Sequence, residues 1–278
     1  MLNTPTSAAS TKQVRVADIN ICYQIDAPEN PPAGGAATVL LSNSLASNLT
    51  MWNAQVGALT AAGFKVVRYD SRGHGQSDAP VGPYSIAQLA QDAVGLIDAL
   101  ELGRVHLCGL SKGGMVAQYI GAAHADKVLS LTICASAAHL GGAEVWQPRI
   151  DAVSSGGMRA IAEATLQRWF TPAAQTNMPG ELDAVRAMIL STPDVGFIAC
   201  CHAIMQMDQR ASNTTIRTPT RVIVGADDPS TTPAHAAEIA NAIAGASLVE
   251  IPASAHLLNI EQAAAFNDAL LEHLRANT

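Results

Sequence analysis

The sequence is poor in basic and in aromatic residues. It holds 16 Lys and Arg against 23 Asp and Glu, a formal net charge of −7, and 4% of its residues are aromatic. A protein that binds nucleic acid presents a basic patch or stripe to the phosphates. The charge balance therefore speaks against a nucleic-acid partner, and it is ordinary for an enzyme that acts on a small molecule.

Cysteine is scarce and follows no framework pattern. The five cysteines include no C-x-x-C pair, and their odd number does not suit a complete set of disulfides. The neighbours Cys200 and Cys201 could suggest a metal site or a vicinal disulfide, but no His/Cys cluster with zinc spacing accompanies them. We expect both to be buried helix residues, and we expect no metal, no cofactor and a reducing, cytoplasmic environment.

The chain shows no targeting or membrane segment. Its N-terminus lacks a basic start followed by an apolar run, so we expect no signal peptide. No apolar stretch is long enough, and free enough of charges and breakers, to span a membrane. We expect residues 1–12 to form a flexible tail, and we expect no membrane partner.

Apolar residues make up 49% of the 278 positions, enough for one large core with an inserted lobe. Strands are expected as a hairpin over residues 14–25 and as apolar runs over 38–41, 65–69, 104–108, 127–134, 220–224 and 247–251. Helices are expected between them, over 51–62, from Ser85, after Ser111, over 233–245 and over 260–275. This alternation favours a mostly parallel central sheet with helices on both faces.

The rhythm breaks between residues 138 and 215, where no buried strand is expected. Helical segments are expected instead over 158–168, 180–190 and 197–207, with Pro172, Pro179 and Pro193 between or beside them. We expect residues 138–215 to form a helical cap domain, inserted into a core domain made of residues 1–137 and 216–278.

A glycine-flanked serine follows the apolar run at 104–108. The segment from Gly109 to Gly113 fits G-x-S-x-G, a sharp strand–turn–helix that exposes the Ser111 hydroxyl above the strand ends. Glycines are needed there because larger residues would collide with the neighbouring strand and helix. The strand before the motif and the helix after it favour a nucleophile over a chance match.

An acid and a histidine follow later strands. Asp227 and Asp228 come after the strand at 220–224, and His256 comes after the last strand. Only one of the two aspartates can face His256, and we favour Asp228. Because the carboxyl ends of parallel strands share one edge, these side chains can meet Ser111 there. Imidazole can take the serine proton, and a carboxylate fixes its tautomer.

Acyl transfer also needs N–H donors for the oxyanion. The backbone N–H of Lys112, just after the serine at a helix start, is one candidate. The other is expected in the loop after strand 38–41, where we favour the N–H of Leu45. His74, in the segment RGHG, is expected to hold its loop by hydrogen bonds rather than to act on a substrate.

Several stretches carry a resemblance to a known family. They are SNSL (42–45), NLTMW (48–52), VVRYDSRGHGQSDAP, GPYSIAQLAQD, CGLSKGGM, RWFTP (168–172), ACCHAI and AHLLNIEQ. Over about residues 14–274 the chain resembles the α/β-hydrolase superfamily and, within it, the 3-oxoadipate enol-lactonases. The segments SNSL, NLTMW, RWFTP and NIEQ are the more specific ones.

The resemblance implies an α/β-hydrolase fold and a Ser111–Asp228–His256 triad, with the amides of Leu45 and Lys112 as oxyanion donors and no cofactor. It implies that the enzyme opens a small enol-lactone through an acyl-enzyme. The pathway implied is aromatic catabolism through β-ketoadipate. Ser111 would attack the lactone carbonyl, and the enol leaving group would become a ketone.

Two residues depart from the family pattern. Lys112 stands where methionine is usual, and Ala46 stands where glycine is usual. We favour a Lys112 side chain that reaches solvent; the alternative is that it points into the pocket and pairs with an anionic substrate. The lactone carries a carboxylate, so a cation near the pocket is expected. Further candidates for substrate contact lie in the cap: Trp146, Arg149, Arg168 and Trp169.

Other functions stay open at this point. Another cofactor-free carboxylesterase, lactonase, amide hydrolase or perhydrolase, with a small anionic or neutral substrate, would use the same serine turn. A non-catalytic binding protein of this fold would lack part of the triad, and no position is missing. Dehalogenase and epoxide hydrolase reactions use an aspartate where Ser111 stands. A homo-oligomer also stays open.

Overall fold

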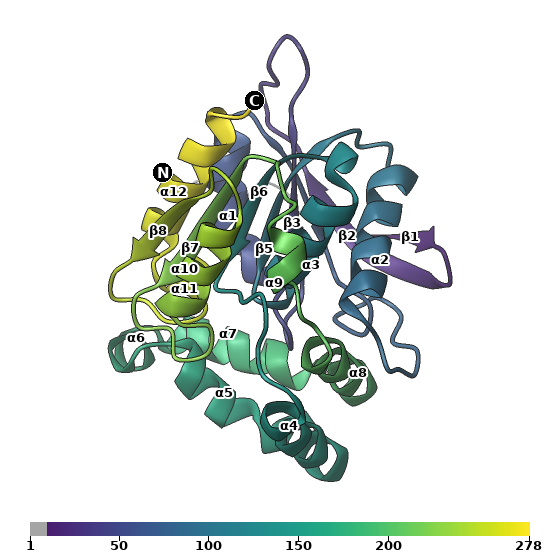
Figure 1. Ribbon diagram of the computed structural model, residues 1–278, viewed down its shortest axis with the longest axis vertical. Coiled ribbons are helices and arrows are strands. Elements are labelled where there is room, and N and C mark those ends of the chain that lie inside the picture. Colours follow the sequence, from purple (N-terminus) through teal and green to yellow (C-terminus); the bar gives the residue numbers. More distant parts are fainter. Residues whose placement is uncertain (1–9) are drawn as a thin grey trace, which may run out of the picture.

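A single sheet of eight strands forms the centre of the protein (Figure 1). The computed structural model describes residues 10–278. The strands are β1 (Lys12–Val16), β2 (Ile19–Asp26), β3 (Thr38–Ser42), β4 (Lys65–Tyr69), β5 (Val105–Leu110), β6 (Val128–Cys134), β7 (Thr220–Gly225) and β8 (Ser247–Ile251). Their order across the sheet is β1-β2-β4-β3-β5-β6-β7-β8. Strands β3 to β8 run parallel to one another, whereas β2 pairs in the antiparallel direction with both β1 and β4. The expected mostly parallel sheet is therefore confirmed.

The central strands are buried on both faces, as parallel strands between helices are. Every residue of β3 and β5 is buried. The register sets Ser42 of β3 opposite Gly109 of β5, and Leu110 opposite Cys134 of β6. Three strands therefore end level with one another directly before Ser111.

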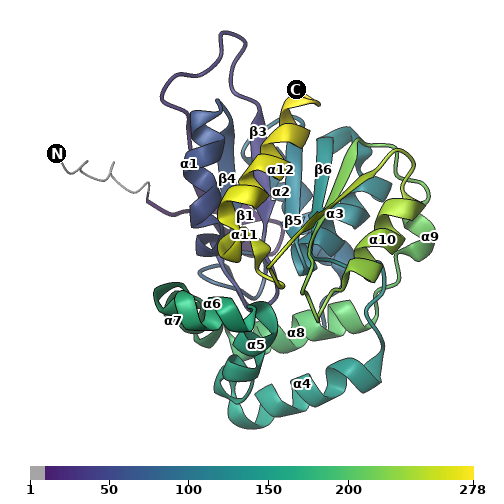
Figure 2. The same ribbon diagram turned by 90° about the vertical axis from the view of Figure 1, so that its left-hand side faces the viewer.

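Helices cover both faces of the sheet. α1 (Asn53–Ala61) and α12 (Ala263–Arg275) pack together on one face (Figure 2). α2 (Ile86–Ala99) and α3 (Lys112–Ala123) pack together on the other, and α10 (Pro233–Ala242) packs against β7 and β8. Short helical turns complete this part: η1 (Leu49–Trp52), η2 (Ala125–Lys127) and α11 (Leu258–Glu261).

The chain between β6 and β7 is helical. It forms α4 (Ala143–Gly156), η3 (Met158–Ala160), α5 (Ala162–Trp169), α6 (Pro172–Asn177), α7 (Pro179–Leu190), α8 (Asp194–Met205) and α9 (Arg210–Asn213). Figures 1 and 2 show α4 to α8 as a layer across one end of the sheet. Gln209 N donates to Ala138 O at 2.8 Å, and this bond joins the two ends of the insertion. Leu257 N donates to Trp169 O at 3.1 Å, which ties the insertion to the loop after β8.

The structure departs from the sequence interpretation at several boundaries. Lys12 already belongs to β1, so the flexible tail expected over 1–12 is wrong at that end; residues 1–9 lie outside the described residues. α4 was not expected, because Pro148 stands inside it and reads as a helix breaker. The helix expected over 158–168 is split into η3 and α5, and α8 begins at Asp194 rather than residue 197.

No single helix within residues 10–278 is long and apolar enough to cross a membrane. The pair α7 and α8 passes the length and composition criteria only when taken together, and it is bent by 91° at the break.

Candidate active site

Ser111 sits in a strained turn between β5 and α3. Its φ of 56° and ψ of −113° lie in a region that residues with a side chain rarely adopt. The surroundings hold it there: Ser111 N donates to Cys134 O at 2.8 Å, and Ser136 Oγ donates to Ser111 O at 2.9 Å. Strain of this kind persists only where neighbouring contacts fix it, and it gathers at functional sites.

The flanking glycines are required by space. A Cβ on Gly113 would lie 2.1 Å from the carbonyl oxygen of Ser42 in β3. A Cβ on Gly109 would lie 2.1 Å from the carbonyl oxygen of Gly113, where α3 starts. Because backbone cannot give way as a side-chain tip can, the turn admits only glycine at both positions, as the sequence motif predicted.

Asp228 and His256 form a buried pair after β7 and β8. His256 Nδ1 lies 2.8 Å from Asp228 Oδ2, and since a carboxylate only accepts, Nδ1 carries the proton. The carboxylate also accepts from Ser230 N at 2.7 Å, Thr231 N at 3.0 Å and Thr231 Oγ1 at 2.8 Å. Burial opposes ionisation, but His256 and the Thr231 donors outweigh it and lower the pKa of Asp228. The pair can therefore hold an imidazole in one tautomer.

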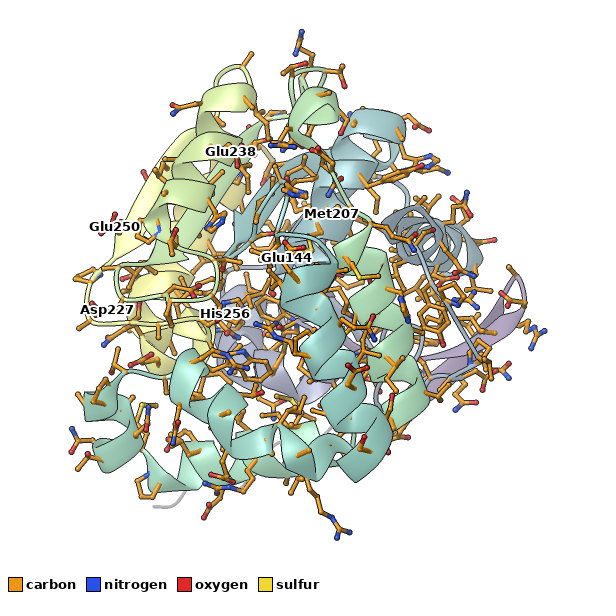
Figure 3. All side chains as sticks on the ribbon, turned by 60° about the horizontal axis from the view of Figure 1, so that its bottom comes forward. Glu144, Met207, Asp227, Glu238, Glu250 and His256 are labelled. Atoms are coloured by element: carbon orange, nitrogen blue, oxygen red, sulfur yellow. The ribbon has the colours of Figure 1, made fainter. Side chains whose placement is uncertain are left out.

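The neighbouring aspartate faces away from this pair. Asp227 is exposed, and Figure 3 shows it at the outer edge of the molecule while His256 lies nearer the interior. Of the two candidates, the structure brings Asp228 to the histidine and leaves Asp227 in solvent.

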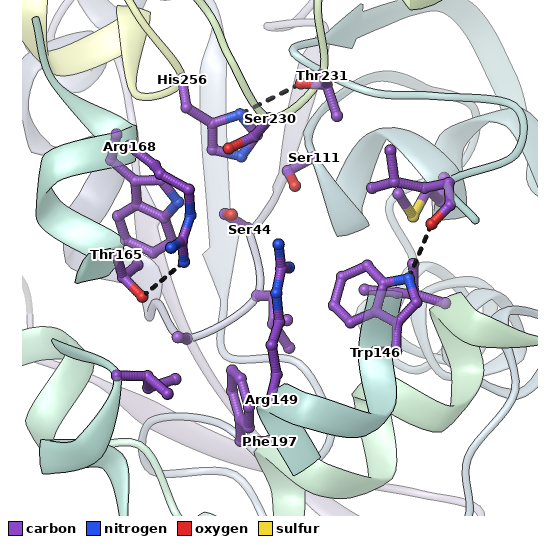
Figure 4. A pocket seen from close by; sticks show the side chains of 17 residues that line it. Ser44, Ser111, Trp146, Arg149, Thr165, Arg168, Phe197, Ser230, Thr231 and His256 are labelled. Atoms are coloured by element: carbon purple, nitrogen blue, oxygen red, sulfur yellow. Dashed lines mark hydrogen bonds between the residues drawn. The ribbon is translucent and has the colours of Figure 1, made fainter. Parts of the chain in front are cut away.

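His256 and Ser111 open onto one cavity. Figure 4 shows the Ser111 hydroxyl and the His256 ring facing the same space. The ring is buried and stacks on Trp169, with ring centroids 6.0 Å apart and an interplanar angle of 29°. The stacking on Trp169 and the bond from Nδ1 to Asp228 together fix the orientation of the ring. This arrangement can move a proton between Ser111 and His256 once a substrate fills the space.

The two candidate oxyanion donors are free to bind. Within residues 10–278 neither Leu45 N–H nor Lys112 N–H has a protein acceptor. Leu45 lies in the loop after β3, and Ala46 beside it has a φ of 56°. Ala46 N donates to His74 Nε2 at 3.0 Å, which fixes the loop in this conformation.

His74 plays a structural part here, as the sequence suggested. Its Nδ1–H donates to Arg72 O at 3.2 Å, which leaves Nε2 as the acceptor for Ala46. Burial, and then the nearby Lys112, hold the pKa of His74 well below its ordinary value. The ring therefore stays neutral and keeps its acceptor nitrogen.

Both expectations for the Lys112 side chain were wrong. It reaches neither solvent nor the cavity: it is 1% exposed and does not line the cavity. Its Nζ donates to Ser71 Oγ instead, in the loop after β4. Burial lowers the pKa of Lys112, while Asp70 and Asp92 act to raise it. The side chain is therefore buried in the protein against the loop after β4.

The cavity beside Ser111 has a volume of about 60 Å³ and is mainly apolar. All four cap residues named from the sequence line it: Trp146, Arg149, Arg168 and Trp169. The residues that the sequence did not single out include Ser44, Met115, Ile161, Thr165, Phe197, Ser230 and Thr231. Of these, Ser44 had a signal as part of the SNSL segment after β3, and Ser230 and Thr231 had one because they directly follow Asp228-Pro229 in the strand-end loop.

Two arginines face this cavity without an acidic partner. Arg149 stacks over the Trp146 ring, 4.6 Å from its centroid, and Arg168 Nη2 donates to Thr165 Oγ1 at 3.3 Å. Neither forms an ion pair with a carboxylate of residues 10–278. Burial lowers the pKa of both, and Arg149 lowers that of Arg168 further, yet a guanidinium stays charged. The site can therefore hold an anion.

The described part of the chain contains no group of three or more His, Cys, Asp and Glu placed to hold a metal. All five cysteines are free and buried, and Cys200 and Cys201 are buried residues of α8, as expected.

Residues 39–269 match the alpha/beta hydrolase family, so the chain belongs to that family. It is 35% identical to 3-oxoadipate enol-lactonase 2 of Acinetobacter baylyi over 232 residues, 84% of this chain and 86% of the relative. The crystal structure of the enol-lactonase from Burkholderia xenovorans superposes with a TM-score of 0.91 at 40% identity, covering 95% of this chain and 100% of that one. A thermophilic esterase from Thermogutta terrifontis, in a malate-bound structure, gives 0.88 at 28% identity, covering 97% and 100%. The protein is thus an ester-hydrolysing enzyme.

Proposed function

We propose that this enzyme opens a small anionic enol-lactone of the 3-oxoadipate type, with Ser111, Asp228 and His256 as its catalytic triad. The single observation that carries the proposal is the pair of unpaired arginines, Arg149 and Arg168, on the wall of the Ser111 cavity. The identity to enol-lactonases supports the same substrate class. The pathway would be aromatic catabolism through β-ketoadipate.

The proposed reaction uses the Asp228–His256 pair and the Ser111 turn. His256 takes the Ser111 proton as Oγ attacks the lactone carbonyl, and Asp228 stabilises the imidazolium that forms. The amides of Leu45 and Lys112 hold the oxyanion. Collapse breaks the ring C–O bond, and the His256 imidazolium gives its proton to the leaving enol oxygen, whose carbon chain stays joined to the acyl group. The enol becomes a ketone, and water activated by His256 frees Ser111.

Substrate charge is matched by the cap side of the cavity. A free carboxylate on the lactone would replace the missing acidic partners of Arg149 and Arg168, which are costly to bury unpaired. A neutral ester would leave them unpaired.

We further propose that residues 138–215 act as a cap domain over a core domain of 1–137 and 216–278. Support comes from α4 and α5, which carry the two arginines, whereas the loops after core strands carry the triad. A cytoplasmic location and a homo-oligomer remain predictions from the sequence.

Steady-state kinetics test the proposal directly. We expect kcat/KM for 3-oxoadipate enol-lactone to exceed that for p-nitrophenyl acetate by a wide margin, about 100-fold or more if each arginine contributes a charge-assisted hydrogen bond. Ser111→Ala, with its melting temperature unchanged, should lose both activities. Faster turnover of the neutral ester than of the lactone would reject the substrate, and full activity in Ser111→Ala would reject the nucleophile.

A further inference from the structure

One buried hydroxyl beside the serine turn has no partner. Ser44 is 0% exposed, and its Oγ accepts from and donates to no atom of residues 10–278. The side chain lines the same cavity as Ser111 and His256. Figure 4 shows its hydroxyl directed into the space that those two side chains face.

The neighbouring serine hydroxyls do have hydrogen-bond partners, so the lack of one at Ser44 is not shared by the serines around it. Ser42 Oγ lies 2.8 Å from Tyr69 Oη, and Ser47 Oγ donates to Ser44 O at 2.8 Å. An unpaired buried hydroxyl costs folding free energy, and alanine would avoid that cost at the same position. An unpaired hydroxyl that lines the cavity therefore suggests that its hydrogen-bond partner is an atom of the bound substrate.

The backbone around Ser44 is held rigidly. Asn43 Nδ2 donates to Tyr69 O at 2.7 Å, and Trp52 Nε1 donates to Asn43 Oδ1 at 2.9 Å. On the other side, Ala46 N is fixed by His74. The backbone that carries the hydroxyl is therefore fixed in place beside the cavity, and a donor on a fixed backbone needs little rearrangement to stabilise a transition state.

We propose that Ser44 Oγ–H donates a third hydrogen bond to the oxyanion, beside the amides of Leu45 and Lys112. Ser44 directly precedes Leu45 in the loop after β3, so its hydroxyl and the Leu45 amide reach the cavity from the same segment. Negative charge develops on the carbonyl oxygen as Ser111 adds, and the hydroxyl has no competing acceptor in the free enzyme. The inference rests on the proposed acyl-enzyme function, but it is separable from the choice of lactone.

The test compares Ser44→Ala with Ser130→Ala, using p-nitrophenyl acetate as substrate and butylboronic acid as a tetrahedral mimic. Ser130 is an equally buried serine whose Oγ is bonded to His106 Nδ1 at 2.8 Å, and it does not line the cavity. We expect Ser44→Ala to lower kcat about 10- to 100-fold and to change KM little. We expect the affinity for butylboronic acid to fall by a similar factor. Its melting temperature should stay the same or rise.

Ser130→Ala should do the reverse, with a lower melting temperature and unchanged kinetics. An unchanged kcat and boronic acid affinity in Ser44→Ala would overturn the inference. So would a loss of activity that follows a fall in melting temperature, because that is the behaviour of a structural serine. Ser111→Ala is run alongside: activity that survives there rejects the acyl-enzyme function itself, whatever Ser44 does.

Discussion

At the scale of single residues, Lys112 connects the two halves of the oxyanion site. Its own amide is one proposed donor, and its Nζ donates to Ser71 Oγ. The carbonyl of Ser71 accepts from His74 N at 2.9 Å, and His74 Nε2 accepts from Ala46 N, beside the other donor. One chain of contacts thus runs behind the cavity from Lys112 to the loop of Leu45. We therefore expect the lysine to position the oxyanion site and not to contact the substrate.

Lys112→Met tests this assignment. The change removes the bond to Ser71 but leaves the cavity wall intact, so kcat should fall by about tenfold or less for the lactone and for a neutral ester alike. The KM for the anionic lactone should change by less than about twofold. Steady-state kinetics on both substrates provide the measurement. A rise in KM confined to anionic substrates would show that Lys112 contacts the substrate after all.

The two adjacent aspartates give a second residue-scale prediction. Asp228→Asn removes the charge that stabilises the imidazolium and disturbs its tautomer, so kcat should fall by about 10³- to 10⁴-fold. Asp227→Asn is the matched control, since that side chain is exposed, and its kcat should stay within about twofold. If Asp227→Asn proves the more damaging of the two, the acid has been assigned wrongly.

At the scale of elements, the loops after the strands carry the proposed catalytic groups, and the inserted helices α4 and α5 carry the two arginines proposed to bind the substrate carboxylate. The central strands could be predicted from the sequence because each is a short apolar run bounded by turn residues. This is the pattern of a strand that is buried on both faces of a parallel sheet. α4 could not, because Pro148 hides it, and it is the helix that supplies Arg149. The serine turn was predictable because only glycine fits at Gly109 and Gly113. The path of Lys112 was not, because it depends on packing behind the turn.

Substitution of Arg149 and Arg168 tests whether the inserted helices bind the substrate carboxylate. Arg149→Met and Arg168→Met should each raise KM for the enol-lactone about tenfold or more, since each removes one charge-assisted hydrogen bond. Neither should raise KM for p-nitrophenyl acetate. Arg159→Met, an exposed arginine of the neighbouring turn η3, serves as the control and should change neither value. Equal losses on both substrates would mean that the arginines support the cap rather than bind an anion.

At the scale of the whole molecule, buried histidines make stability depend on pH. His106 is fully buried in the sheet, and burial, followed by the neighbouring His273, lowers its pKa from 6.5 to about 4. Burial lowers the pKa of His273 as well. The unfolded chain therefore takes up these protons at a higher pH than the folded protein does. The free energy of unfolding contributed by these groups should fall as the pH drops from about 6.5 to about 4.

His106→Gln isolates this effect from the buried carboxylates. Burial raises the pKa of Asp70 and Asp92, which changes stability in the opposite direction as the pH falls. Urea unfolding of both proteins between pH 7 and pH 4 gives the difference in stability that His106 causes. This difference should shift in favour of the variant on acidification, by no more than about 1.4 kcal/mol per pH unit. A difference that does not vary with pH would contradict the assignment.

In the proposed mechanism Ser111 opens the lactone and becomes acylated. The most direct measurement is mass spectrometry of the enzyme quenched in acid during turnover of 3-oxoadipate enol-lactone, followed by peptide mapping. Because the leaving oxygen stays joined to the acyl chain, we expect Ser111 to gain the mass of one whole lactone, and we expect no gain in Ser111→Ala. An adduct on any other residue, or lactone turnover that survives in Ser111→Ala, would contradict it.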